Sequence, residues 1–184
     1  MHASSFFFDC RSVARPILAT LAALALLAMP RFVISSGIRA DTILRYTNQA
    51  RALVAAPPLR TDIALTIAAQ QRAEEMIAHQ YFAHERPNGS SFATAAREAQ
   101  YPFERIAENL AIAYTEELLL VHAWQASVSH RDVLLHPPYT DTGIGIASGM
   151  YRGVPTTVVV QFFGERRPPA LRSWQPLPSA LAHS

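Results

Sequence analysis

The hydrophobic pattern along the chain has three parts. Residues 17–29 form a run dominated by Ala and Leu that contains no charged residue. From residue 42 to residue 128, apolar residues recur every three or four positions, which is the pattern of helices with one buried face. Between residues 143 and 163 the period shortens to two, which is typical of strands.

Four helices are expected in the middle part, over residues 42–56, about 62–80, 91–99 and 116–129. Pro57 and Pro58 end the first helix, and Thr61 or Asp62 can cap the second. The residues predicted for the buried faces are Ile43, Tyr46, Ala50, Leu53 and Val54 in the first helix, Leu65, Ala69, Ala73, Met76 and Ile77 in the second, and Leu120, Trp124 and Val128 in the fourth.

The last part predicts a β-hairpin. Residues 144–146 alternate Ile with Gly, and residues 156–163 are rich in β-branched and aromatic side chains. Residues 149–153 join these two runs, residues 110–114 add a third strand, and residues 101–105 are expected to form a loop. Helices followed by a hairpin predict an α+β domain, with helices packed on a small antiparallel sheet.

The apolar run marks the N-terminal segment for export. Arg11 and Arg15 precede it, and Ala40 offers a small residue for cleavage, as in a signal peptide. The run is shorter than the ~20 residues that span a bilayer. Residues 1–40 are therefore interpreted as a signal peptide or an uncleaved signal anchor, with membrane contact through residues 17–38 only in the second case. The expected location is periplasmic, cell-surface or extracellular.

After residue 40 the chain divides into a domain over residues 41–165 and a Pro-rich tail over residues 166–184. The composition of this part restricts the kinds of site that the domain can form. The single cysteine is Cys10, so the domain has no disulfide, thiolate metal site or cysteine nucleophile. From residue 41 onward, 12 Arg and no Lys stand against 13 Asp and Glu, a net formal charge of −1. This balance disfavours nucleic acid as a partner, because phosphate backbones attract basic surfaces.

Three short segments carry polar groups suited to chemistry: residues 81–84 (Tyr-Phe-Ala-His), residues 107–111 (Ala-Glu-Asn-Leu-Ala) and residues 124–134, which begin Trp-Gln-Ala-Ser-Val-Ser-His-Arg. Together with residues 143–145 (Gly-Ile-Gly) and 161–164 (Gln-Phe-Phe-Gly), they resemble the bacterial branch of the CAP superfamily, the cysteine-rich secretory, antigen 5 and pathogenesis-related 1 proteins. The resemblance covers residues 42–164 and implies an α-β-α sandwich.

The resemblance also implies a site. In the eukaryotic branch two His and two Glu line a cleft, and His84, Glu108 and His130 match three of these four positions; the second Glu has no match. Asn109 and Ser127 are expected to brace the three. Two imidazoles and a carboxylate could hold a divalent metal such as zinc with one open position, or carry out acid–base chemistry without metal.

Three functions remain open for such a chain. The preferred one is an exported protein that binds an extracellular or cell-envelope ligand, or a divalent metal, in the His/Glu cleft. The second is a metal-assisted hydrolase of cell-envelope or extracellular polymers. The third is a structural or adhesive module in which Glu108 only pairs with Arg105 or Arg131. The missing carboxylate weakens catalysis more than it weakens ligand binding.

Overall fold

The computed structural model describes residues 37–168, so the apolar run at 17–29 and the tail from residue 169 lie outside the described residues. The elements along the chain are α2 (Ala40–Ala52), β1 (Arg60–Thr61), α3 (Ile63–Ala78), α4 (Phe92–Glu98), β2 (Phe103–Ile112), α5 (Glu117–Ala126), α6 (Val128–Leu135), β3 (Asp141–Tyr151) and β4 (Val154–Arg166). Among these residues, no helix has both the length and the hydrophobicity required to cross a membrane.

The sheet has the strand order β1-β3-β4-β2. β3 and β4 form the predicted antiparallel hairpin, and β2 pairs antiparallel with the other side of β4. Arg152 and Gly153 turn the hairpin with φ angles of 49° and 81°, as a two-residue turn with the twist of the flanking strands requires. β1 adds a parallel pairing to the first residues of β3 and is too short to leave a signal in the hydrophobic pattern.

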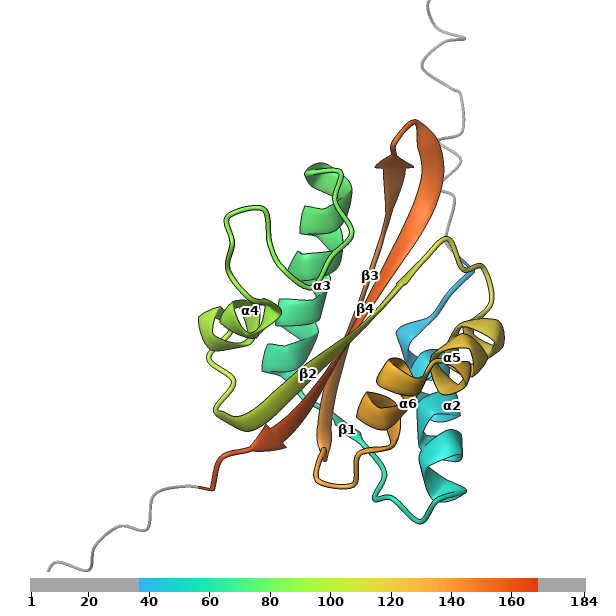
Figure 1. The fold of residues 1–184 in the computed structure, drawn as a ribbon, viewed down its shortest axis with the longest axis vertical. Coiled ribbons are helices and arrows are strands. Elements are labelled where there is room, and N and C mark those ends of the chain that lie inside the picture. The colour runs from blue at the N-terminus through green and yellow to red at the C-terminus, as the bar shows by residue number, and fades with distance from the viewer. Residues whose placement is uncertain (1–36, 169–184) are drawn as a thin grey trace, which may run out of the picture. The chain divides into compact units, whose positions relative to one another are not determined.

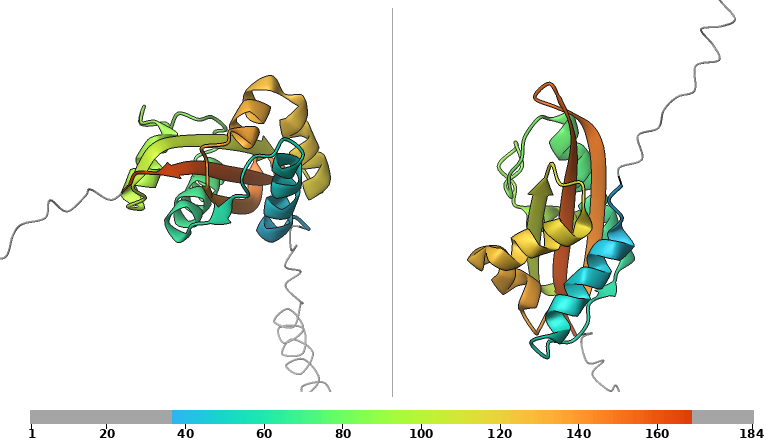
Figure 2. Two further views of the ribbon diagram at one scale, coloured as in Figure 1. Left: turned by 90° about the horizontal axis from the view of Figure 1, so that it is seen from below. Right: turned by 90° about the vertical axis from the view of Figure 1, so that its right-hand side faces the viewer.

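Helices cover both faces of this sheet. Figure 1 shows α3 and α4 on one side of the strands and α2, α5 and α6 on the other, and the right-hand view of Figure 2 shows the second group in front of the strands. Alternate residues of β4 supply the two cores: Val158, Val160 and Phe162 pack in the α3 layer, and Val159 and Phe163 in the α2 layer. The predicted α+β class and α-β-α sandwich are confirmed.

Helix α3 lies directly against β3. A Cβ atom on Gly143 or Gly145 would come within 2.0 Å or 2.2 Å of the backbone of Leu65 or Ala69, so no larger residue fits at these two positions. The Asp62 side chain caps the helix by accepting a hydrogen bond from the Leu65 N–H. The helix predicted from about residue 62 is thus confirmed and ends two residues early.

Two helix predictions fail at their C-terminal ends. Helix α2 stops at Ala52, which leaves Leu53 and Val54 exposed instead of buried. The predicted helix over residues 116–129 breaks at Ser127, whose ψ of 125° is extended, and Val128 is exposed at the start of α6. The break has a physical reason: the Trp124 indole N–H donates to the Leu110 carbonyl of β2, which holds the end of α5 against the sheet.

The prediction of a loop over residues 101–105 is also wrong, because β2 begins at Phe103 and runs well ahead of the expected strand. Tyr101 and Phe103 favour a strand, but Pro102 lies between them and two charged residues follow, so the local strand signal is weak. Their strand conformation comes from pairing with β4, where Phe103 lies opposite Arg166 and Arg105 opposite Glu165.

Candidate functional site

Edge strand β2 organises the candidate site. Successive strand residues point to opposite faces, and here Ile106 and Leu110 pack in the α3 layer while Ala107 and Ala111 pack in the α2 layer. Glu108 and Asn109 are adjacent in sequence, so their side chains point into different layers. Because β2 is the last strand of the sheet, groups from both layers can meet around its edge.

Glu108 is buried on the α3 side, and its side chain has no exposed surface. One carboxylate oxygen accepts a hydrogen bond from Nε of Arg72 at 3.2 Å, and the other lies 2.9 Å from Nδ1 of His84. A buried carboxylate is costly unless it is paired and hydrogen-bonded, and both of its oxygens have partners here. Arg105, one of the two partners expected for Glu108, pairs with Glu165 instead.

Arg72 is the functional candidate that the sequence interpretation missed. Its side chain is 1% exposed, and it lies on the face of α3 that also buries Ala69 and Met76. The guanidinium donates to the Tyr81 hydroxyl at 2.5 Å and to the carbonyls of Ala83 and His84 at 2.8 and 3.3 Å. A charged residue within an apolar stripe was the available signal, since Arg is rarely buried unless it is paired.

His84 lies in the segment between α3 and α4, with 53% of its side chain exposed. Its ring meets Phe92 edge-on at 6.1 Å between centroids. Since Nδ1 faces Glu108, the second ring nitrogen, Nε2, is left for other partners. The half-exposed ring is thus bonded through Nδ1 to the carboxylate of a buried ion pair.

A second set of ion pairs anchors the same segment. Arg86 pairs with Glu75 of α3 at 3.0 Å and with Glu98 of α4 at 3.0 Å, and Glu75 lies 3.7 Å from Arg72. Burial raises the pKa of Tyr81, which bonds Arg72, to about 12, so its hydroxyl stays protonated at neutral pH. The residues before and after His84 are therefore held by charge as well as by packing.

His130 approaches from the opposite layer. Its Nδ1 lies 2.9 Å from the Ser127 hydroxyl, and the Asn109 amide donates to the His130 carbonyl at 3.1 Å. Burial lowers the pKa of His130, and the positive charge that His84 can carry lowers it further. The His130 ring bonds Ser127 and not Glu108, so no hydrogen bond joins it to the His84–Glu108 pair.

The side chains of the candidate site do not form the predicted zinc site. Within residues 37–168, no three His, Cys, Asp or Glu side chains are grouped so that they could hold a metal ion. Both oxygens of Glu108 are engaged by Arg72 and His84, so the carboxylate does not offer itself as the third ligand of a catalytic zinc. The side chains as arranged do not fit three-ligand coordination, and zinc binding stays a prediction.

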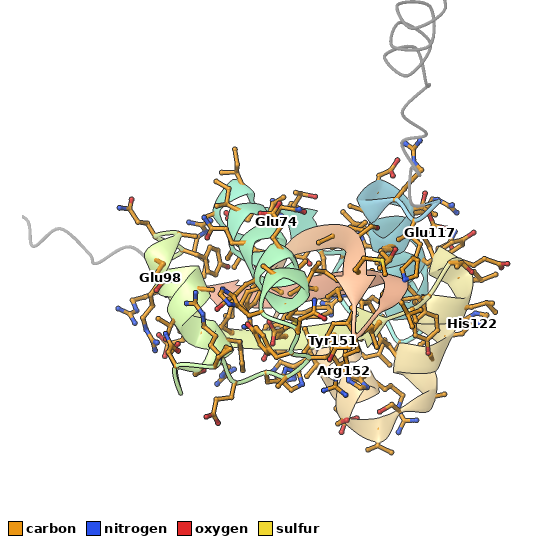
Figure 3. All side chains as sticks on the ribbon, turned by 90° about the horizontal axis from the view of Figure 1, so that it is seen from above. Glu74, Glu98, Glu117, His122, Tyr151 and Arg152 are labelled. Atoms are coloured by element: carbon orange, nitrogen blue, oxygen red, sulfur yellow. The ribbon has the colours of Figure 1, made fainter. Side chains whose placement is uncertain are left out.

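A cavity of about 170 Å³ lies elsewhere, between α2 and α5. Its lining residues are Tyr46, Gln49, Ala50, Leu53, Leu118, Val121, His122 and Gln125. In Figure 3 the labelled His122 of α5 lies on the opposite side of the strands from Glu98 of α4, the outer member of the ion pairs beside His84. The cavity shares no residue with the His84, Glu108 and His130 set.

A small sheet between two helical layers, with a His–Glu pair at its edge strand, defines an α-β-α sandwich of the CAP type. The sequence model of the cysteine-rich secretory protein family, CAP, matches residues 44–163, and the chain belongs to this family. The resemblance expected from the ordered motifs is thereby confirmed.

Three similar proteins share little sequence identity with this chain. The chain is 27% identical over 103 residues to the uncharacterized protein YkwD of Bacillus subtilis, which covers 56% of this chain and 40% of that protein. An extracellular protein containing an SCP domain from Bacillus anthracis superposes with a TM-score of 0.57 at 24% identity, over 69% of this chain and 40% of that one. An outer surface protein of Borrelia burgdorferi gives 0.60 at 20% identity, over 69% and 92%. At such identities the superpositions establish the fold.

Proposed function

We propose that this chain is an exported CAP-domain protein that binds a cell-envelope ligand through the site formed by His84, Glu108 and His130. The observation that carries the proposal is the buried Glu108–Arg72 pair behind a half-exposed His84. Replacing a buried ion pair by apolar residues often leaves a protein as stable or more stable, so such a pair is weak evidence for a purely structural role. Here it supports a ring that faces solvent.

Binding fits this arrangement better than hydrolysis. A general base has to reach the proton that it abstracts, directly or through one water. The Glu108 carboxylate is fully buried, and Arg72 and His84 occupy its oxygens. The two imidazoles remain as the groups that can contact a ligand.

Location outside the cytoplasm rests on two supports. The N-terminal segment has the basic, apolar and small-residue order of an export signal. Two structurally similar proteins are described as an extracellular protein and an outer surface protein. The N-terminal sequence of protein recovered outside the cytoplasm tests this part of the proposal and shows whether residues 1–40 are removed.

A divalent metal is the second candidate ligand, because two imidazole nitrogens are ligands that zinc accepts. With Glu108 occupied by Arg72, we expect weaker binding than at a site with three protein ligands. Titration of the purified chain with zinc measures it directly.

The test of the binding site uses two double variants of the purified chain. His84→Ala/His130→Ala removes both rings of the site, and His79→Ala/His122→Ala removes two exposed histidines elsewhere as the matched control. We expect co-sedimentation with purified peptidoglycan, or zinc affinity, to fall at least ~10-fold only in the first variant, a loss of ~1.4 kcal/mol. Equal binding by both variants and the wild type would exclude the site.

A further inference from the structure

Arg72 makes more contacts to the site than an ion pair requires. Its guanidinium bonds a carboxylate of β2, the hydroxyl of Tyr81 and the carbonyls of Ala83 and His84. Only a planar group with several fixed N–H donors can make this set of bonds at once. Arg72 therefore connects the acid of the site to the backbone that carries the histidine of the site.

We propose that Arg72 is the positioning residue of the site, which holds His84 in the tautomer that is protonated at Nδ1 and leaves Nε2 as an acceptor toward solvent. On this basis the group that His84 receives is a hydrogen-bond donor, such as a hydroxyl, an amine or an amide N–H, and not an anion. The statement about the ligand of His84 rests on the proposed function, whereas the assignment of Arg72 is independent of it.

The tautomer follows from the hydrogen bonds. A carboxylate paired with a guanidinium only accepts, so the ring nitrogen 2.9 Å from Glu108 is the one that carries the proton. Which nitrogen of a histidine is protonated is decided by the partner of the ring, and here Arg72 holds that partner. Arg72 also bonds the His84 carbonyl, so the backbone and the carboxylate are fixed relative to each other.

The polarity of the site follows from its charges. Arg72 and Glu108 neutralise each other, and the adjacent set of Glu75, Arg86 and Glu98 has one more acid than base. In its neutral form, the His84 imidazole offers a lone pair at Nε2 without a positive charge. An anionic ligand group would find no cation free to attract it among the residues that bond one another here.

The test reads the ring nitrogens of His84 by long-range proton–nitrogen NMR on the ¹⁵N-labelled full chain, with the signals assigned by their loss in His84→Gln. At about pH 8, above the ordinary histidine pKa of ~6.5, we expect protonated Nδ1 and unprotonated Nε2 in the wild type. In Arg72→Met the carboxylate and the loop are no longer held together, and we expect Nε2 to become protonated in most molecules. Arg72→Lys keeps the positive charge but lacks the planar set of N–H donors, so we expect a mixture of the two His84 tautomers.

Arg51→Met is the matched control, because Arg51 is equally buried but bonds only backbone carbonyls in the other layer. It should leave the His84 signals unchanged. A wild-type ring protonated at Nε2, or an unchanged ring in Arg72→Lys, would overturn the assignment even if Arg72→Met does not fold. A shift of the wild-type His84 signals on adding inorganic phosphate would show that His84 receives an anion, which would overturn the statement about its ligand. Because the nitrogen signals need no ligand, failure of the proposed function leaves this result intact.

Discussion

Two arginines of the described chain are completely buried, and they lie in opposite layers of the sandwich. Arg72 bonds the Glu108 carboxylate and supports an exposed imidazole. Arg51 of α2 has no acid among its hydrogen-bond partners. It donates to the carbonyls of Pro57, Leu134, His136 and Tyr139, at 2.8, 2.8, 3.1 and 2.8 Å.

The difference lies in what each guanidinium satisfies. Arg51 occupies backbone acceptors around the end of α2 and the segment after α6, where no regular element supplies donors. Burial lowers the pKa of Arg51, because the carbonyls stabilise its charge less than water does. Arg72 instead pairs with the Glu108 carboxylate, which in turn lies beside the half-exposed His84 ring. Burial of a charge alone therefore does not distinguish a candidate binding site from a structural contact; the charge of the acceptor and the exposure of the neighbouring side chain do.

The largest effect is expected for Arg51→Met. This change leaves buried carbonyls without donors, and we expect the free energy of unfolding to fall by about 4 kcal/mol, the sum of a few unsatisfied groups at about 1–3 kcal/mol each. Denaturant unfolding measures it. Peptidoglycan or zinc binding by the folded fraction should stay at the wild-type level, and reduced binding there would contradict a purely structural role.

A smaller and reparable effect is expected for Arg72→Met. The single change leaves the Glu108 carboxylate buried without its cation and should cost about 3 kcal/mol. In Arg72→Met/Glu108→Leu the unpaired charge is gone, and stability should return to within about 1 kcal/mol of the wild type while binding stays lost. Denaturant unfolding and the binding assay on the same samples check both. If the double variant is less stable than the single one, the pair is structural, like Arg51.

The smallest effect concerns pH and His130. Its folded-state pKa is lowered, so the unfolded chain binds a proton more readily than the folded chain. This contribution to stability is complete above the ordinary pKa of ~6.5 and is lost as the pH falls below it. Between about pH 7.5 and pH 5.5, unfolding free energy should therefore fall more steeply in the wild type than in His130→Gln. Equal slopes would show that the ring is as accessible to protons as in the unfolded chain.

Local patterns predicted the parts of the fold that local forces stabilise. Helix α3 could be located to within two residues, because its apolar stripe and its Asp62 cap are written in adjacent positions. The start of β2 and the break at Ser127 could not, because they depend on Arg166 opposite Phe103 and on the bond from Trp124 to Leu110. Such partners lie far apart in sequence, and no window of neighbouring residues contains them.

The candidate site divides in the same way. His84, Glu108 and His130 were found through ordered motifs shared with a family, and the structure bonds the first two to each other. Arg72 was missed because helical periodicity treats a stripe position as apolar, although its charge was visible at a position that α3 buries. The expected partners of Glu108 were Arg105 and Arg131, which are nearer in sequence, whereas the fold brings Arg72 of α3 to the carboxylate.

The alternation of β2 has an evolutionary consequence. Substitutions along this strand change one contact at a time, but an insertion or deletion of a single residue ahead of Glu108 would exchange the faces of all residues after it. The carboxylate would then enter the layer of α6, and the Asn109 amide would meet the guanidinium of α3. The length of β2 up to Glu108 therefore cannot change by an odd number of residues without separating Glu108 from Arg72 and Asn109 from His130 at once.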